Sequence, residues 1–90
     1  MPIKMYWIYA VYNREKDKIY IGQTDNIERR LLEHNNKDNP RHKFTRRYKG
    51  DWTLFYQEEC SSRIEALKRE KQLKSFRGRE FIKDKLNIPV

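Results

Sequence analysis

The chain has 90 residues but only one cysteine, Cys60, and two histidines, His34 and His42. A single cysteine excludes an intrachain disulfide, so the fold has to be held together by the packing of its core. One cysteine and two histidines also fall short of the four ligands of an ordinary structural zinc site. This length suits one domain, and we assign residues 1–90 to a single domain.

Glycines and long apolar runs are equally scarce. The three glycines, Gly22, Gly50 and Gly78, are scattered, so the chain has neither a P-loop nor a GxGxxG phosphate-binding turn. No serine stands in the sequence context of a hydrolase nucleophile. The sequence shows no apolar stretch of membrane-spanning length and no signal peptide, and we therefore expect a soluble, cytoplasmic protein without a membrane partner.

Basic residues, in contrast, are abundant, with 21 Lys and Arg against 13 Asp and Glu and a formal net charge of +8. Such a charge on a small domain favours a polyanionic partner, and we expect nucleic acid. The alternative is a solvated surface that only confers solubility. Residues 41–49 mix cations with Phe44 and Tyr48, which suits phosphate contacts and base stacking. The expected nucleic-acid-binding residues are Arg29, Arg41, Lys43, Arg46, Arg47, Lys49, Lys71, Lys74 and Arg77.

Aromatic and β-branched residues predict three strands, over residues 5–12, 18–22 and 51–57. The polar residues between the first two strands predict a turn that joins them as an antiparallel hairpin. The first strand has apolar residues at consecutive positions, which is typical of a strand covered on both faces.

Capping boxes at Asp25 with Glu28 and at Ser62 with Glu65 predict helices over residues 26–35 and 63–76. Gly78 is expected to end the second of these helices, and short helices are expected over 41–49 and 81–86. The predicted fold is therefore of the mixed α/β class and of the α+β type. It is a small three-stranded antiparallel sheet flanked by helices, in the order ββα(α)βα(α).

Glu70 is out of place on its predicted helix. Ala66 stands four residues before Glu70, Leu67 stands three before it, and Leu73 stands three after it. Glu70 therefore falls inside the apolar arc of the helix that should face the sheet. A carboxylate in such a position needs a compensating partner or a metal ion. The alternative is an ordinary surface ion pair with Lys74, four residues further on.

Four further polar side chains are placed to act together. Arg30 and His34 are four residues apart and project from one face of the first helix, where an arginine presents donors matched to phosphate oxygens. Tyr9 and Tyr20 lie on neighbouring strands, so that their hydroxyls can meet at one edge of the sheet. The alternatives are a solvated helix face for the first pair and ordinary core tyrosines for the second.

These residues together resemble the GIY-YIG nuclease family. Trp7-Ile8-Tyr9 and Tyr20-Ile21-Gly22 look like the two halves of its signature, and the step of eleven residues between the tyrosines is within its range. Arg30, His34 and Glu70 stand where the family has its catalytic arginine, a common histidine and its metal-binding glutamate. The chain is most similar to small standalone members, which are related to the incision domain of the excision-repair protein UvrC.

The resemblance implies a metal-dependent endonuclease that hydrolyses phosphodiester bonds, with one Mg²⁺ or Mn²⁺ ion held by Glu70. Its implied catalytic residues are Tyr9, Tyr20, Arg30, His34 and Glu70. Arg30 would hold the non-bridging phosphate oxygens, and Tyr9 would orient or deprotonate the attacking water. Tyr20 would position water or phosphate, and His34 would accept a proton or bind phosphate. The sequence leaves the roles of these last three residues interchangeable.

Three departures from the family pattern bear on proton transfer. Trp7 replaces the first glycine of the signature, Gln23 stands where UvrC-like domains have a lysine, and the asparagine that follows their glutamate helix has no clear counterpart.

No element for reading base edges is evident, so we expect low sequence specificity or a preference for substrate structure, with DNA favoured over RNA and a role in DNA repair or recombination. Two alternatives remain open: a nucleic-acid-binding module without activity, and a catalytic subunit that needs a protein partner.

Overall fold

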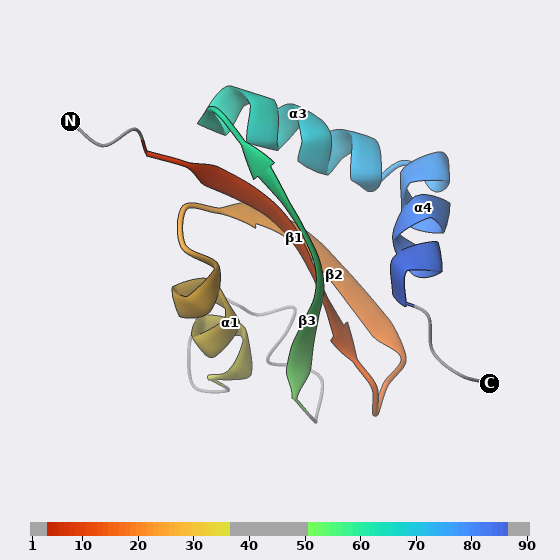
Figure 1. Ribbon diagram of the computed structural model, residues 1–90. Helices are drawn as coiled ribbons and strands as arrows, with labels where there is room; N and C mark the ends of the chain where they lie inside the picture. The colour runs from red at the N-terminus through yellow and green to blue at the C-terminus, as the bar shows by residue number, and fades with distance from the viewer. Residues whose placement is uncertain (1–3, 37–50, 87–90) are drawn as a thin grey trace.

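The computed structural model describes residues 4–36 and 51–86 (Figure 1). Its elements are β1 (Tyr6–Asn13), β2 (Lys18–Thr24), α1 (Ile27–Asn35), β3 (Trp52–Cys60), α3 (Arg63–Leu73) and α4 (Phe76–Leu86). The strands form one antiparallel sheet in the order β2-β1-β3. This is the predicted α+β fold, a three-stranded sheet with helices packed against it. The prediction of a helix over 41–49 lies outside the described residues, and the assignment of residues 1–90 to one domain stays a prediction.

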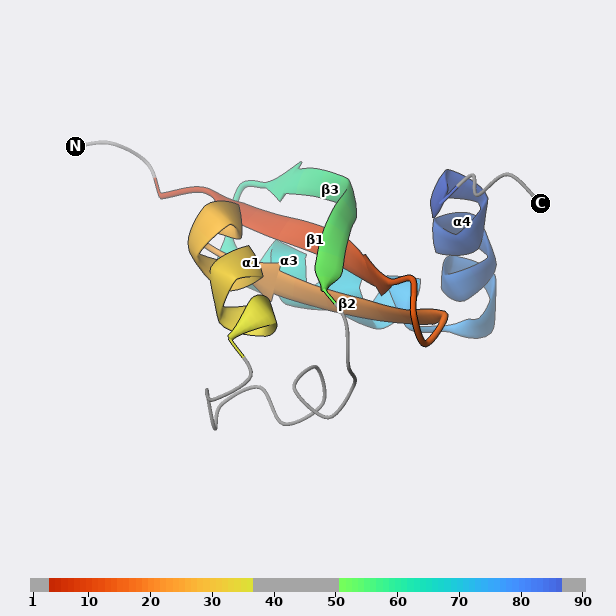
Figure 2. The ribbon, with the colours of Figure 1, turned by 90° about the horizontal axis from the view of Figure 1, so that it is seen from below.

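β1 is the central strand and is covered on both faces, as its sequence predicts. Ile8 and Ala10 point to one face and contact the buried residues of α3 and α4, whereas Tyr9 and Val11 point to the other face, towards α1. Figure 2 shows α1 in front of the strands and α3 behind them. Because β2 is an edge strand, residues from the α1 face and from α3 can meet around its edge.

The hairpin between β1 and β2 forms as predicted. Asn13 Oδ1 accepts a hydrogen bond from the backbone N–H of Lys16 at 3.0 Å, and the Tyr12 hydroxyl donates to Asp17 Oδ1 at 2.8 Å. Asp17 adopts a left-handed backbone with φ of 52°, a conformation that aspartate tolerates in turns. The hairpin fixes a register in which Tyr9 lies opposite Gly22 and Val11 lies opposite Tyr20.

One predicted cap is correct and the other is wrong. Ser62 caps α3, and its side chain accepts a hydrogen bond from the backbone N–H of Glu65. At α1 the cap is Asn26 and not Asp25, and Asn26 Oδ1 accepts from the backbone N–H of Arg29 at 3.0 Å. The Asp25 carboxylate instead forms ion pairs with Lys4 and Arg29, so it is not the group that caps the helix.

The end of α3 also differs from the prediction. α3 stops at Leu73, and α4 begins at Phe76, so that Gly78 lies inside a helix and does not terminate one. A Cβ atom at Gly78 would lie 2.1 Å from the backbone oxygen of Gln72. Gly78 is therefore required by the close approach of the first turn of α4 to the last turn of α3.

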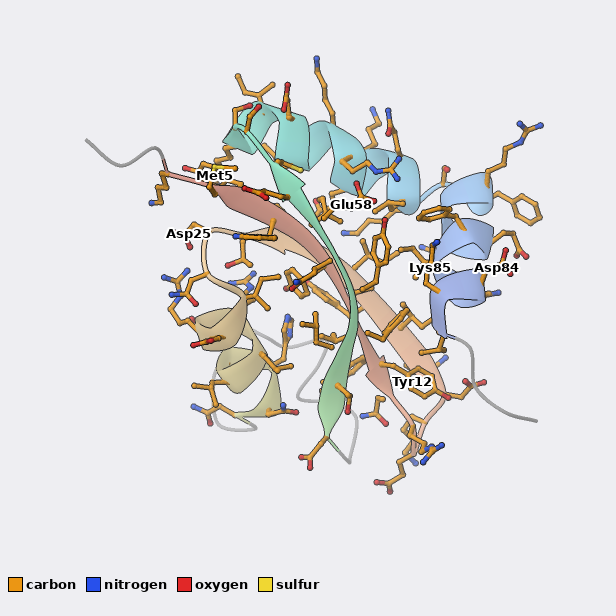
Figure 3. All side chains as sticks on the ribbon, in the orientation of Figure 1. Met5, Tyr12, Asp25, Glu58, Asp84 and Lys85 are labelled. Atoms are coloured by element: carbon orange, nitrogen blue, oxygen red, sulfur yellow. The ribbon has the colours of Figure 1, made fainter. Side chains whose placement is uncertain are left out.

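An ion pair holds α3 against β3. Arg69 Nε and Nη2 both donate to the Glu58 carboxylate at 2.9 Å, and the Tyr56 hydroxyl also donates to it. Figure 3 shows Glu58 between β3 and α3. This network lowers the pKa of the Glu58 carboxyl, chiefly through the hydrogen bonds from Arg69, although partial burial opposes the shift. Within residues 4–36 and 51–86, none of the helices has the length and apolar content that a membrane span requires.

Candidate active site

The Tyr9 hydroxyl is the centre of the site. Tyr9 is 2% exposed, and its Oη lies 2.6 Å from His34 Nε2 and accepts a hydrogen bond from Arg30 Nε at 3.3 Å. Because a guanidinium can only donate, His34 Nε2 is the one of these two partners that can accept the phenol proton, and it does so in the neutral tautomer that carries its ring proton on Nδ1. Three of the residues expected from the sequence therefore form one hydrogen-bonded chain, which is buried at Tyr9 and His34 and partly exposed at Arg30.

Helix α1 positions Arg30 and His34 through its apolar stripe. Ile27 and Leu31 pack against Tyr9, Val11 and Trp52, and Arg30 and His34 follow on the same face at helical spacing. Of these two polar residues, His34 is fully buried and the Arg30 side chain is 30% exposed. The alternative of a fully solvated helix face is therefore wrong for both residues.

The end of α1 is fixed by Asn35. Its side-chain amide donates to the backbone oxygen of Trp52 at 3.1 Å, and its Oδ1 accepts from the backbone N–H of Trp52 at 2.7 Å. These two bonds tie the residue after His34 to the beginning of β3. Sequence reasoning missed this role, because an Asn-Asn pair at the end of a helix indicates a break in the helix and not a contact with a distant strand.

Gly22 gives Tyr9 the room it needs. Residues opposite each other in an antiparallel pair share a face of the sheet, so a side chain at position 22 would point towards the Tyr9 ring. A Cβ atom there would lie 2.8 Å from Tyr9 Oη and 3.0 Å from Tyr20 Cε1. Glycine at this position therefore lets the two phenols approach each other, with their ring centroids 6.3 Å apart.

Tyr20 brings the site to the surface at the β2 edge. Its half-buried ring lies edge-on to the His34 ring, with centroids 4.8 Å apart. Lys74 Nζ lies 5.9 Å from the centre of the same ring. A cation thus stands beside Tyr20 although Gln23 replaces the lysine of the UvrC-like pattern. This cation, Lys74, is the C-cap residue of α3 and does not come from β2.

Glu70 faces the sheet as the helical wheel predicts. Ala66 and Leu73 on the same face are buried, and the Glu70 side chain is 22% exposed. Leu67 is 44% exposed, so its predicted place in the buried arc is wrong. The predicted alternative is also present, since Lys74 Nζ lies 3.8 Å from Glu70 Oε1. That separation is long for an ion pair and leaves the carboxylate only weakly compensated.

Burial and neighbouring charges have opposing effects on the pKa of the Tyr9 phenol. Burial raises the pKa of the Tyr9 phenol far above its ordinary value, and the hydrogen bond from Arg30 opposes this shift. The charge of the Glu70 carboxylate acts in the same direction as burial. Lys74 lies near both Glu70 and Tyr20, and Tyr20 packs against Tyr9 and His34, so the five residues that were expected to act in catalysis lie in one region of the structure.

The four described residues that were expected to bind nucleic acid lie on α1 and around the end of α3. Arg29 lies at the start of α1 and pairs with Asp25 at 2.5 Å and with Glu33 at 3.5 Å. Lys71 and Arg77 are exposed near the junction of α3 and α4, and Lys74 stands in the site itself. The remaining predicted residues lie outside the described ranges: Arg41, Lys43, Arg46, Arg47 and Lys49.

The candidate site suits a metal ion that needs few protein ligands. Among residues 4–36 and 51–86, no group of three His, Cys, Asp or Glu side chains is placed to enclose an ion. Of the five expected catalytic residues, Glu70 is the one that carries a carboxylate, and Lys74 compensates it only weakly. This suits Mg²⁺ or Mn²⁺, which take one or two carboxylates and complete their coordination with water and phosphate oxygens.

Comparison with known proteins identifies the family of this chain. The family model described as the GIY-YIG catalytic domain matches residues 5–83. The UPF0213 protein SH2523 of Staphylococcus haemolyticus and the UPF0213 protein SSP2268 of Staphylococcus saprophyticus are each 33% identical to the chain over 78 residues. Each alignment covers 87% of this chain and 90% of the relative, so the relatives are themselves small proteins. No solved structure matches the chain. Because the family match spans most of the sequence and contains all five expected site residues, the chain belongs to the GIY-YIG catalytic domain family.

Proposed function

We propose that this protein is a metal-dependent endonuclease that hydrolyses phosphodiester bonds in nucleic acid, with DNA favoured over RNA. Membership of the family implies nuclease-type activity and nucleic-acid binding, and GIY-YIG nucleases generally use divalent metal ions. The observation that supports the proposal most directly is the hydrogen-bonded chain from Arg30 through Tyr9 Oη to His34. Tyr20 lies beside this chain, and Lys74 lies near both Tyr20 and Glu70.

Arg30 is the residue that holds the scissile phosphate. Its Nε is used by Tyr9, and its Nη1 lies 3.3 Å from Glu33 Oε2, but five N–H groups leave further donors for phosphate oxygens. Since the Arg30 side chain is 30% exposed, these donors reach the surface. A guanidinium in this place stabilises negative charge as it develops on the non-bridging oxygens.

Tyr9 and His34 form the proton path. Because burial raises the pKa of Tyr9, the phenol stays protonated in the resting enzyme and does not act as a free phenolate. The attacking water loses a proton to Tyr9 Oη while Tyr9 passes its own proton to His34 Nε2, which becomes an imidazolium. The resulting hydroxide oxygen bonds to phosphorus, the bond to the leaving oxygen breaks, and that oxygen takes a proton from solvent. The complete burial of His34 favours this role over direct phosphate binding.

Glu70 would hold the metal ion, and Tyr20 would position the water or the phosphate next to it. One bound Mg²⁺ or Mn²⁺ supplies positive charge that stabilises the leaving 3′ oxygen. Lys74 Nζ lies 3.8 Å from Glu70 Oε1 and 5.9 Å from the centre of the Tyr20 ring. We therefore assign Lys74 a place in the site, in addition to its predicted contact with nucleic acid.

The substrate is expected to be chosen by structure more than by sequence. The cations on the described surface are suited to phosphates, and phosphate contacts carry no base information. Across a panel of single-stranded, duplex, flap and branched substrates with Mn²⁺, we expect cleavage of some structures and little dependence on their sequence.

The test compares active-site and surface variants on that panel. Glu70→Ala and Arg30→Ala should each abolish cleavage and leave the fold intact. Glu80→Ala and Arg14→Ala are matched controls: Glu80 is an exposed carboxylate paired with Lys83, and Arg14 lies in the turn after β1. Both controls should cleave as the wild type does. Wild-type rates for Glu70→Ala and Arg30→Ala would show that the mechanism is wrong.

The same assay separates the two alternatives. Tight binding of nucleic acid without cleavage of any substrate, with either ion, would indicate a binding module with an inactive site. Cleavage that appears only when a second protein is added would indicate a partner-dependent catalytic subunit.

A further inference from the structure

A polar groove opens beside Arg30, where β2 ends and α1 begins. Four cations from three parts of the chain line it, together with a single carboxylate. They are Lys4 before β1, Arg29 and Arg30 of α1, Arg63 of α3, and Asp25. Figure 3 shows Asp25 at this junction, near Met5 and the start of α1. The excess of cations makes the groove suited to an anion.

The ion pairs in the groove orient its cations without using all their donors. Asp25 accepts from Lys4 Nζ at 3.0 Å and from Arg29 Nη2 at 2.5 Å. Glu33 pairs with Arg29 at 3.5 Å and with Arg30 at 3.3 Å. An ammonium group has three donors and a guanidinium has five, so every cation keeps N–H groups for a further acceptor.

Arg63 is the least compensated member of the groove. No carboxylate within residues 4–36 and 51–86 forms an ion pair with it, and its side chain is exposed. It stands in the first turn of α3, where a cation is disfavoured by the helix dipole. The stability of α3 therefore does not account for an arginine at this position, whereas binding of an anion in the groove does.

The groove is continuous with the candidate active site through Arg30, which lines the groove and also donates to Tyr9. At the other end of β2 a larger groove contains Tyr20 and Lys74, which also belong to the site. The seven residues of β2 span about 20 Å at the usual rise of a strand. The site thus lies between two cationic grooves along one strand edge.

We propose that Lys4, Arg29 and Arg63 bind the backbone phosphate adjacent to the scissile phosphate. Arg30 holds the scissile phosphate at the boundary of the groove, and the other three cations hold its neighbour on the same strand. The inference rests on the proposed nuclease function and adds the course of the substrate, which follows the edge of β2. It also implies that a minimal diester with one phosphate gains nothing from the groove.

The test compares Arg63→Gln with the wild type on two substrates. The first is bis(4-nitrophenyl) phosphate, which has a single phosphate, and its hydrolysis should stay within twofold of the wild type. The second is an oligonucleotide with a mapped cleavage site, on which kcat/KM should fall about tenfold, as expected for the loss of one charge-assisted hydrogen bond at an exposed position. Arg14→Gln, with the same loss of charge, should change neither reaction.

Uncharged linkages in the oligonucleotide can show which phosphate Arg63 contacts. Each phosphate near the cleavage site is replaced in turn by a methylphosphonate. In the wild type, one linkage next to the cut should cost about tenfold in kcat/KM, and in Arg63→Gln that linkage should cost nothing further, because the contact is already lost. Additive losses at every linkage, or an equal fall on both substrates, would overturn the proposal.

Failure of the nuclease function would be recognised separately. If the wild type cleaves neither substrate, the nuclease proposal fails, and the groove is then tested by fluorescence anisotropy with a short labelled single-stranded oligonucleotide. Arg63→Gln should weaken binding about tenfold relative to Arg14→Gln. Equal affinities of the two variants would overturn the groove as a phosphate site.

Discussion

At the scale of single residues, Tyr9 Oη is the atom on which the site depends. β1 supplies the phenol, α1 supplies Arg30 and His34, and Gly22 of β2 leaves space for the ring. Because Tyr9 is 2% exposed and its hydroxyl bonds to His34 and Arg30, the loss of either partner removes a hydrogen bond from a largely buried residue. The position of this one oxygen therefore connects the packing of the sheet to the chemistry.

Tyr9→Phe isolates that oxygen, because it keeps the ring and removes the hydroxyl. We expect the single-turnover cleavage rate to fall by about 10²- to 10⁴-fold, the usual effect of losing a general base. The free energy of unfolding should fall by about 1–3 kcal/mol, because His34 Nε2 loses its phenol partner. Tyr12→Phe is the matched control, since it removes an exposed hydroxyl bonded to Asp17. If both variants cleave at the wild-type rate, Tyr9 is not part of the proton path.

The ion pairs of Asp25 should make the folding stability of the protein depend on pH in the acid range. Hydrogen bonds from Lys4 and then Arg29 lower the pKa of the Asp25 carboxyl to about 2. The unfolded chain therefore binds this proton at a higher pH than the folded chain does, so stability is lost as pH falls from about 4 towards 2. Melting temperatures measured over this range should fall less steeply for Asp25→Asn than for the wild type. Equal slopes would show that the ion pairs contribute nothing.

At the scale of elements, local patterns predict most of the fold. The consecutive apolar residues of β1, the aromatic and β-branched residues of β2 and the Ser62 cap each act within a few residues, so the sequence shows them directly. Contacts between elements were not visible in the same way. The sequence does not show that Asp25 pairs with Lys4, that Asn35 binds the backbone of Trp52, or that Lys74 reaches Tyr20. These contacts depend on how helices are placed around the sheet.

At the α3–α4 junction, the structure and helix propensity predict opposite effects of replacing Gly78 on folding stability. Glycine inside a helix is ordinarily less stable than alanine by about 1 kcal/mol, so helix propensity alone predicts that Gly78→Ala stabilises the protein. The structure predicts the opposite, because the new Cβ would meet the backbone of Gln72 and Leu73, which cannot rotate away. We expect urea denaturation to show a loss of about 1–3 kcal/mol. A gain in stability would show that α4 does not approach α3 this closely.

At the scale of the whole molecule, the net charge of +8 can act in two ways. As a diffuse field it would attract any polyanion, and every cation would contribute equally to binding. As a set of defined phosphate contacts, only cations along the substrate would contribute, because each contact releases counterions from one phosphate. The exposed Lys71 and Arg77 near the α3–α4 junction are expected contacts, whereas Arg14 and Lys16 lie in the turn between β1 and β2.

The salt dependence of binding distinguishes these cases, because two double variants can remove the same charge from different places. For duplex DNA, the slope of log K against log salt changes by about 0.9 for each phosphate contact that is lost. We expect Lys71→Gln with Arg77→Gln to reduce the slope by about 2 and Arg14→Gln with Lys16→Gln to leave it unchanged. Fluorescence anisotropy in EDTA, which prevents metal-dependent cleavage, measures both slopes. Equal slopes for the two double variants would mean that the charge acts as a diffuse field, and the surface near the α3–α4 junction would then not be part of the path of the substrate.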